Sequence, residues 1–333
     1  MIREKNIKKL IHFLFWNEAA LKAEMAEKTG ISVVTINHLV KGLVEENHLI
    51  EGELVQQKLG RPAIEYHFNY GKHYYLLVSI QEENHCLGVM SKIVDLRGRE
   101  VYATWHDFDP ITLETFKEIV SVGLRQDYPI SKIGISIPGK VNGDTITSSW
   151  YDKFDDWHIK AELAQVSDIP VLIQNDAHVM TIGYCINHNI ALEENIVGIY
   201  YPANSMPGIT IFSNGQLVEG NFSLAGEAKY LPMLIDSPEP QTGQELAEKL
   251  SDIAALYNVI IAPNHFILSS DKVQQSVIEQ QLKQNTYLER HPNKPSIHFD
   301  DNFQQSVTSG LRWLVSQQSM YEHILFNEER SYD

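Results

Sequence analysis

Cysteine is scarce in this chain, which has two among its 333 residues, Cys86 and Cys185. Two thiols cannot build a disulfide-rich scaffold or a cysteine-rich zinc site. We interpret both as buried thiols, because free cysteine is mostly a core residue. The 14 histidines show no His-Glu-x-x-His or similar ligand spacing. We therefore expect no metal site.

Long apolar segments are also absent. No run of about 18 apolar residues could form a membrane span. The first residues, Met1 to Lys5, lead into an amphipathic stretch rather than the apolar core of a secretory signal. Apolar residues make up 43% of the chain and charged residues 21%, as in globular proteins. We expect a cytoplasmic protein of about two or three domains, without a membrane partner.

Positive charge is in short supply overall, but its distribution is uneven. The net charge of −16 argues against nucleic-acid binding by the chain as a whole. Residues 1–72 hold ten Lys and Arg against nine Asp and Glu, whereas the remaining 261 residues hold 17 against 34. The acidity thus lies in the larger part, and this asymmetry permits DNA binding at one end.

The N-terminal residues have the pattern of three helices. Gly30 marks the end of the second helix and Ser32 the start of the third. Apolar residues at helical spacing form the inner faces: Ile7, Leu10, Ile11, Leu14 and Phe15, then Leu21, Met25 and Ala26, then Ile36, Leu39, Val40, Leu43 and Val44. Two helices joined by a short turn that contains glycine form the helix-turn-helix pattern. An ordinary three-helix bundle has the same periodicity.

The outer face of the third helix carries short polar groups near its start. Such groups suit base edges or phosphates in the major groove of DNA. The candidate DNA contacts on this face are Ser32, Val34, Thr35, Asn37, His38 and Lys41. On the alternative interpretation the same face is only solvated surface.

Two strands are expected next, over 49–55 and 63–68, because apolar and polar residues alternate there. Between them lies Lys58-Leu59-Gly60-Arg61-Pro62, which we interpret as the tip of the wing in a winged helix-turn-helix. Arg61 at this tip would suit an A·T-rich minor groove, whose narrow shape strengthens the negative potential. As an ordinary surface charge it would make no such contact. We assign residues 1–72 to this DNA-binding domain.

From residue 74 the pattern changes to an alternation of strands and helices. Strands are expected over 74–80, 86–90, 101–105, 132–137, 169–174, 196–200, 209–212, 216–218 and 266–269, and helices over 112–126, 161–166 and 177–187. Polar residues follow several of these strands, which predicts a ligand cleft at their carboxyl ends.

Several motifs of this part occur in a characteristic order: Ile133-Gly134-Ile135-Ser136-Ile137-Pro138-Gly139-Lys140-Val141, Asp156-Trp157, Asn175-Asp176-Ala177, Asn214-Gly215 and Ala225-Gly226-Glu227. With these motifs the chain resembles the ROK family (repressors, unknown reading frames and sugar kinases), over about residues 5 to 270. The N-terminal helices make it similar to the family's repressors. The resemblance implies an α/β fold class, with an N-terminal winged helix-turn-helix followed by an actin-like, sugar-kinase-like, two-lobed ROK domain over residues 73–333.

The resemblance also implies which residues would hold a ligand. In ROK kinases the aspartate matching Asp176 is the general base for the sugar hydroxyl, and the residues matching Asn175 and Glu227 hold the sugar. Carboxylates can accept hydrogen bonds from adjacent hydroxyls, as sugars require, and Gly139 would let the backbone approach a ring closely. Asp176 would also serve as a cap for the helix that follows it, and the two roles can coexist.

The phosphate-binding features of ROK kinases are missing. Where family kinases have an Asp-x-Gly-Gly-Thr turn, this chain reads Ile80-Gln81-Glu82-Glu83-Asn84. The second loop, 201–208, contains two prolines, which lack the N–H donors that bind phosphate. The family's zinc motif has no counterpart after Glu227, because no cysteine follows Cys185. We therefore expect no enzyme activity, no catalytic residue, no metal and no cofactor.

The leading hypothesis is a transcriptional regulator, a repressor of carbohydrate-related genes, that binds a double-stranded DNA operator. Its kinase-derived domain would form a homodimer or higher homo-oligomer and would sense a sugar or sugar-phosphate effector. One alternative is a sugar kinase that retains Asp176 as its base. Another is a regulator that has lost sensing and works through protein partners.

Overall fold

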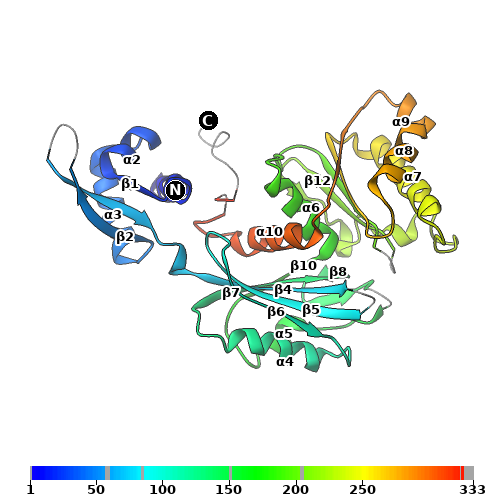
Figure 1. Cartoon of the computed structure of the whole chain (residues 1–333), viewed down its shortest axis with the longest axis horizontal. Helices are drawn as coiled ribbons and strands as arrows, with labels where there is room; N and C mark the ends of the chain where they lie inside the picture. The colour runs from blue at the N-terminus through cyan, green and yellow to red at the C-terminus, as the bar shows by residue number, and fades with distance from the viewer. Residues whose placement is uncertain are drawn as a thin grey trace.

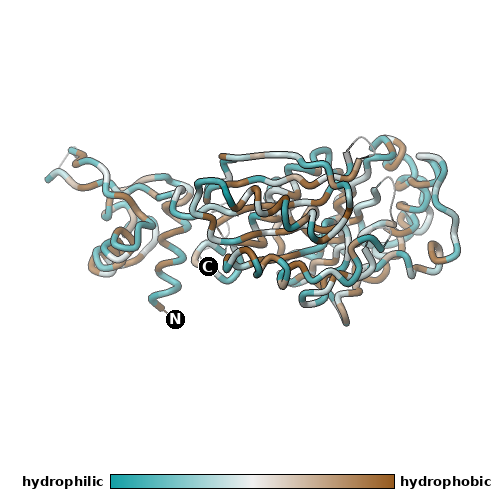
Figure 2. Tube along the Cα trace, turned by 90° about the horizontal axis from the view of Figure 1, so that it is seen from below, coloured by the Kyte–Doolittle hydropathy of each residue, from teal (hydrophilic) through white to brown (hydrophobic). Residues whose placement is uncertain are grey.

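The structure, a computed structural model, describes residues 2–56, 61–83, 86–149, 152–202, 206–322 and 324–325. A small N-terminal unit, here called the head (2–68), lies beside a larger α/β body, which begins at residue 74 (Figure 1). Seen from below, the head lies at one end of the elongated molecule (Figure 2). Within the described residues no helix is both long and apolar enough to cross a membrane.

The head is a winged helix-turn-helix. Its helices are α1 (Ile2–Asn17), α2 (Lys22–Thr29) and α3 (Val33–Glu45), and its strands are β1 (Ala19–Leu21), β2 (Leu49–Val55) and β3 (Ala63–Phe68), in the sheet order β1-β3-β2. Gly30 ends α2 in the left-handed conformation, with φ of 66°, and Ser32 caps α3, as predicted. Leu21, predicted in the second helix, instead ends β1 and pairs with Glu65.

The body contains two five-stranded sheets with the same topology. The first sheet has the order β10-β7-β4-β5-β6 and the second β13-β12-β11-β14-β15. In each sheet the first strand in the chain is central, the next two follow antiparallel on one side, and the last two run parallel to it on the other side. This repetition makes a body of two lobes, because each sheet forms the centre of its own layer.

The first sheet consists of β4 (Tyr74–Glu83), β5 (Cys86–Asp95), β6 (Glu100–Asp107), β7 (Ile130–Ile137) and β10 (Val171–Asn175), and the second of β11 (Ile196–Tyr200), β12 (Gly208–Ser213), β13 (Gln216–Leu217), β14 (His265–Ser269) and β15 (Ser296–Phe299). A small ribbon, β8 (Lys140–Asn142) and β9 (Thr145–Thr147), follows β7. Strand β5 is five residues longer than the predicted 86–90, because it pairs along its whole length with β4.

Helices separate and cover the two sheets (Figure 1). The first sheet has α4 (Leu113–Leu124) and α5 (Ile159–Leu163) on its outer face, α6 (Asp176–Asn187) and α10 (Phe303–Ser316) lie between the sheets, and α7 (Gly243–Ile261), α8 (Gln275–Gln284) and α9 (Thr286–Arg290) cover the second sheet. The predicted helix 161–166 begins earlier, at Ile159, whose side chain is buried against the first sheet.

Helices α6 and α10 touch backbone to backbone. A Cβ atom on Gly183 of α6 would overlap with the carbonyl oxygen of Ser306, and one on Gly310 of α10 would overlap with that of Val179. The glycines therefore allow the two central helices to approach more closely than side chains would permit. Nearby, the Ser309 hydroxyl donates to the Asn187 side chain over 2.7 Å.

The head packs on the body through a continuous apolar core. Leu14 and Phe68 of the head share this core with Tyr75 and Leu96 of the first lobe and with Tyr321, which lies beyond α10. The two cysteines differ in environment. Cys185 is buried, as predicted, but the interpretation of Cys86 as a buried thiol is wrong, because Cys86 is exposed at the start of the strand.

We expect Gly310→Ala to lower the melting temperature of the protein strongly, because the added methyl group meets backbone atoms that cannot move aside. Overpacking of this kind costs about 1–3 kcal/mol or more. The matched control is Gly42→Ala in α3, where a Cβ atom has nothing within 4 Å. There the same substitution should be neutral or stabilising by up to about 1 kcal/mol. Equal melting temperatures for the two variants would contradict the close helix contact.

Candidate functional site

A cleft of about 690 Å³ lies between the two lobes. Its walls come from the carboxyl ends of parallel strands in both sheets: Gln81 near the end of β4, Gly139 after β7, Asn175 at the end of β10, Tyr200 at the end of β11 and Asp271 after β14. The ends of parallel strands leave loops and helix starts with unpaired polar groups, which is where α/β proteins bind ligands. The volume suits a small molecule.

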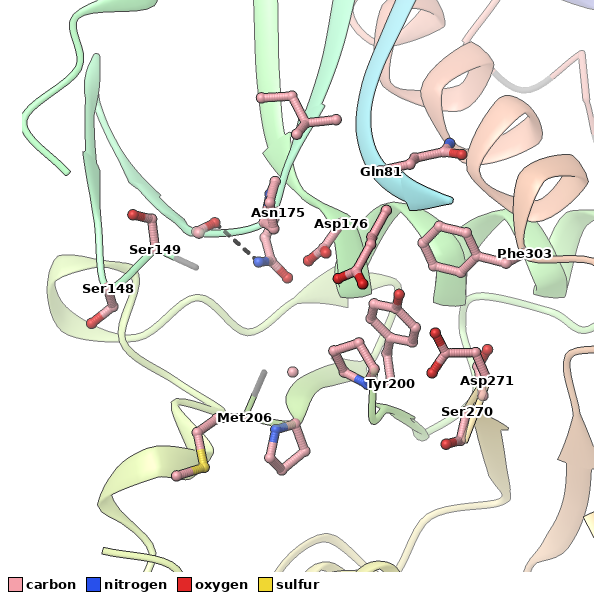
Figure 3. Close-up of a pocket in the computed structure, with 18 of the residues that line it drawn as sticks. Gln81, Ser148, Ser149, Asn175, Asp176, Tyr200, Met206, Ser270, Asp271 and Phe303 are labelled. Carbon is pink, nitrogen blue, oxygen red and sulfur yellow. Dashed lines mark hydrogen bonds between the residues drawn. The ribbon is translucent and has the colours of Figure 1, made fainter. Parts of the chain in front are cut away.

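All four residues predicted to bind a ligand line this cleft: Gly139, Asn175, Asp176 and Glu227. In Figure 3 Asn175 and Asp176 lie side by side, with Ser148 and Ser149 on the Asn175 side. The first three come from the first lobe and the start of α6, and Glu227 comes from the segment after β13. The fold thus brings together residues that are 88 positions apart in the chain, from Gly139 to Glu227.

The Asn175 side chain mainly makes hydrogen bonds that stabilise the fold. Its side-chain oxygen caps α6 by accepting from the backbone N–H groups of Ala177 (3.1 Å) and His178 (3.4 Å). Its amide nitrogen donates to the Gly139 carbonyl oxygen over 3.0 Å. The same side chain also hydrogen-bonds to the Asp176 carboxylate, so both of its N–H donors are engaged within the protein. The helix-capping role proposed for Asp176 belongs chiefly to Asn175, although the Asp176 carboxylate also accepts from Ala177 N–H over 2.8 Å.

The space beside Gly139 is filled by protein rather than by a ligand. A Cβ atom there would lie 2.9 Å from the Ser149 side chain and 3.0 Å from that of Ile146. Gly139 therefore serves the close packing of the β8–β9 ribbon, and its carbonyl holds Asn175. This structural role differs from the close approach to a sugar ring expected from the sequence.

Asp176, Glu227 and Lys140 form the electrostatic centre of the cleft. Burial raises the pKa of the Asp176 carboxyl to about 6, against the lowering effects of Ala177 N–H and the Lys140 charge. Burial also raises the pKa of Glu227, again opposed by Lys140. The Lys140 side chain is almost fully buried, which lowers its pKa, while Glu227 and Asp176 oppose that shift. Its ammonium donates to the Ala225 carbonyl over 3.1 Å.

Carboxylates dominate the rest of the lining as well. Eight acidic side chains line the cleft, against the two lysines Lys140 and Lys229: Glu82, Asp152, Asp176, Glu227, Glu239, Asp271, Asp300 and Asp301. Tyr200 lies among them, and its ring stacks on Phe303 with centroids 4.7 Å apart. Burial, together with the charges of Asp176, Asp271, Glu82 and Asp300, raises the pKa of the Tyr200 hydroxyl well above its ordinary value. Figure 3 shows Tyr200 between Asp176 and Asp271.

The sequence did not single out Lys140, Tyr200 or Phe303 as parts of a site. Lys140 directly follows the Pro138-Gly139 pair, and Tyr200 ends a strand. Both could have been predicted as cleft residues, because polar groups gather at the carboxyl ends of parallel strands. Phe303 has no such signal, because its place in the cleft depends on α10 crossing from the second lobe to the first. Three or more His, Cys, Asp or Glu side chains placed to hold a metal ion do not occur among the described residues.

The second candidate site is the outer face of α3. Ser32, Val34, Asn37, His38 and Lys41 are all exposed, and Thr35 is half-buried. Val34 is 80% exposed, although it is a large apolar residue. The Ser32 hydroxyl lies 2.9 Å from that of Thr35 and accepts from its N–H, so this pair also caps the helix. Lys41 lies 3.8 Å from Glu45, one turn further along α3.

The wing is formed by β2 and β3, which follow α3 in the chain and pair antiparallel. Of its predicted tip, Lys58, Leu59 and Gly60 lie outside the described residues, and Arg61 is exposed. Residues 203–205 of the second kinase-type loop also lie outside them, whereas Pro202 and Pro207 line the cleft.

The two sites together define a class of protein: a winged helix-turn-helix head joined to a two-lobed body with a ligand cleft. Residues 92–244, a little under half of the chain, match the model of the ROK family. The xylose repressors of Bacillus subtilis strain 168 and of Bacillus spizizenii are 23% and 24% identical over 255 and 260 residues, which is 73% of this chain. The chain spans 64% of the length of each of these curated relatives.

Solved structures share the fold. A ROK family transcriptional regulator, a homologue of the E. coli MLC protein, has a TM-score of 0.63 at 14% identity and covers 97% of this chain and 98% of its own. A ROK family glucokinase from Streptomyces griseus, in complex with glucose and AMPPNP, has a TM-score of 0.56 at 14% identity over 73% of this chain and 99% of its own. The α/β fold class expected from the sequence, with its actin-like body, is confirmed.

We expect Asp176→Asn to raise the melting temperature above pH 6. The raised pKa means that the folded protein holds this proton more tightly than the unfolded chain, so stability falls as pH rises from about 4 through 6. The neutral amide avoids this loss, and the gain should shrink as pH falls toward 4. The measurement is a series of melting curves from pH 4 to 8. Asp168→Asn, at an exposed position, is the control. A pH-independent difference for Asp176→Asn would contradict the buried carboxylate.

Proposed function

We propose that this protein is a DNA-binding transcriptional regulator, a repressor of carbohydrate-related genes. Residues 1–72 would bind an operator, and residues 73–333 would form a dimer and sense a small carbohydrate. The observation that carries the proposal is the exposed face of α3, with polar groups at its N-terminal end, on a head joined to a cleft lined by hydroxyl acceptors. The relatives named xylose repressor support the same function.

The head would read DNA with the first turns of α3. Asn37 and His38 can hydrogen-bond to base edges, and the exposed Val34 suits the methyl group of thymine. Lys41 and Arg61 would contribute charge toward phosphates and the minor groove. The acidic body would be repelled by the duplex, which restricts binding to the head. Two heads in a dimer would reach half-sites about 34–36 Å apart, or a multiple of this.

The cleft would bind the effector. Asp176 and Glu227 can accept hydrogen bonds from neighbouring hydroxyls of a sugar, and Asn175 would hold the Asp176 carboxylate in position through its side-chain hydrogen bond. The excess of carboxylates opposes a phosphate group, because like charges repel strongly in a partly buried site. Of the two effector classes expected from the sequence, we therefore favour an uncharged sugar over a sugar phosphate.

The alternative function is a sugar kinase, for which Asp176 would be the base. We propose that the chain lacks this activity. Glu82 lies in the cleft where a triphosphate would need positive charge, and Pro202 and Pro207 cannot donate backbone N–H groups to phosphate.

We expect DNA binding to depend on the α3 face. A duplex selected from a random library with the full-length protein serves as the probe, and fluorescence anisotropy gives its affinity. Asn37→Ala and His38→Ala should each weaken binding to the selected duplex about 5- to 150-fold, which corresponds to the loss of about 1–3 kcal/mol of base discrimination.

Lys41→Ala should weaken binding to all duplexes alike and reduce the slope of log affinity against log salt concentration by about 1. Lys283→Ala on α8, with the same charge change, is the control. Failure to enrich any duplex would refute the proposed DNA-binding function.

We expect a neutral sugar to raise the melting temperature of the protein, in a screen of pentoses, hexoses and disaccharides. The 6-phosphates of the hexoses should give no shift. Asp176→Asn and Glu227→Gln should each abolish the shift, because each replaces an accepting carboxylate oxygen with an amide N–H donor, whereas Asp168→Asn should retain it. If no sugar shifts the melting temperature while DNA binding persists, the regulator does not sense sugars and the hypothesis of protein partners replaces sensing.

We expect no ADP when the protein is incubated with ATP, magnesium and the same sugars, as measured by a coupled assay. ADP release that disappears in Asp176→Asn would show a working kinase. That result would overturn our argument from the phosphate loops.

A further inference from the structure

Helix α10 begins in the cleft and ends near the head. The preceding residues Asp300 and Asp301 and its first residues Phe303 and Gln304 line the cleft. Phe303 stacks on Tyr200, and Asp300 fixes the first turn by accepting from the Ser306 hydroxyl over 3.0 Å. A molecule in the cleft would therefore contact the N-terminal turn of α10.

The middle of α10 packs directly on α6. At Gly183 and Gly310 the two backbones are in contact, because a Cβ atom at either position would overlap with a carbonyl oxygen of the other helix. Helix α6 itself starts with Asp176 in the cleft, so both central helices have their N-terminal ends there. A shift at the cleft would move this helix pair as one body, because packed interfaces have discrete arrangements rather than continuous ones.

The far end of α10 is tied to both the body and the head. Lys132 of the first lobe donates to the carbonyl oxygens of Val315 (2.7 Å) and Gln317 (3.1 Å). Beyond α10, the Tyr321 hydroxyl lies 2.7 Å from Nδ1 of the buried His48, which directly precedes β2 of the head. Glu322 pairs with Lys8 of α1 over 2.8 Å.

Apolar burial strengthens the same junction. Tyr321, Ile324 and Leu325 are 3%, 3% and 8% exposed and belong to the core that contains Leu10 and Phe68 of the head. The ring of Tyr321 lies edge-on to Phe68, with centroids 6.4 Å apart. The segment after α10 is thus a structural part of the head as well as of the body.

We propose that α10 and the segment around Tyr321 transmit the occupancy of the cleft to the position of the DNA-binding head. The proposal rests on the proposed function for its biological meaning, but the mechanical coupling is independent of it. Tyr321 is a positioning residue: it is neither on the α3 face nor in the lining of the cleft, and its hydroxyl contacts His48 of the head. Allosteric couplings between such sites typically change affinity about 5- to 150-fold.

Hydrogen–deuterium exchange of the full-length protein tests the coupling without a known operator or effector. Phe303→Leu and Phe303→Ala disturb the cleft end of α10. Each should raise exchange rates in β2, in β3 and in 317–322 by about fivefold or more. Val277→Ala, which loosens α8 in the second lobe, should leave these rates unchanged. If both Phe303 variants raise exchange only around the cleft, the proposal is overturned.

A double-variant cycle isolates Tyr321. Tyr321→Phe keeps the ring but removes the hydroxyl that contacts His48. In this background Phe303→Leu should still raise exchange at the cleft but should no longer affect the head. A purely structural role for Tyr321 predicts additive effects, and additivity would refute its role in coupling.

The selected duplex provides a second readout. Phe303→Leu should change its affinity about 5-fold or more in the wild-type background and leave it unchanged with Tyr321→Phe. If the unmodified protein binds no DNA, the proposed function is rejected. The hydrogen–deuterium exchange experiment would still decide whether α10 couples the cleft to the head.

Discussion

The close contact between α6 and α10 is the constraint on which the rest of the structure depends. Gly183 and Gly310 let two helices from different lobes meet at their backbones. Because this helix pair lies between the two sheets, it fixes how the lobes face each other, and the cleft is the space left at their strand ends. The same pair brings the segment after α10 to the head. Cleft, lobes and head are therefore arranged around one small area of contact.

The cleft combines polar chemistry with costly burial. Asp176, Glu227 and Lys140 share a poorly solvated region in which the carboxyl pKa values are raised and the lysine pKa is lowered. Such an arrangement costs stability without contributing to packing, as is typical of functional sites. The surrounding carboxylates and the two prolines are the basis of our proposal that the cleft binds an uncharged ligand rather than nucleotide phosphates.

Local patterns in the sequence predicted the elements well where a single stretch of chain decides the outcome. The stripe of α3, its Ser32 cap and the Gly30 end are local, and so is the alternation that predicts β2 and β3. The predicted elements were wrong in two situations. Strand pairing extended β5 beyond its predicted end, and pairing with β3 placed Leu21 in a strand rather than in the predicted helix. The resemblance identified Asn175, Asp176 and Glu227 as cleft residues, but it did not reveal that Asn175 caps α6 or that Ser149 fills the space beside Gly139.

By itself the sequence determined the class of each element, the acidic character of the body and the polar outer face of α3. These properties depend on composition and on spacing over a few residues. Only the tertiary structure decided that Lys140 interacts with the carboxylates of Glu227 and Asp176, that Phe303 reaches the cleft and that Tyr321 meets His48. Tyr321 and His48 are 273 positions apart, and their contact follows from the packing of two sheets around one helix pair, which no local pattern contains.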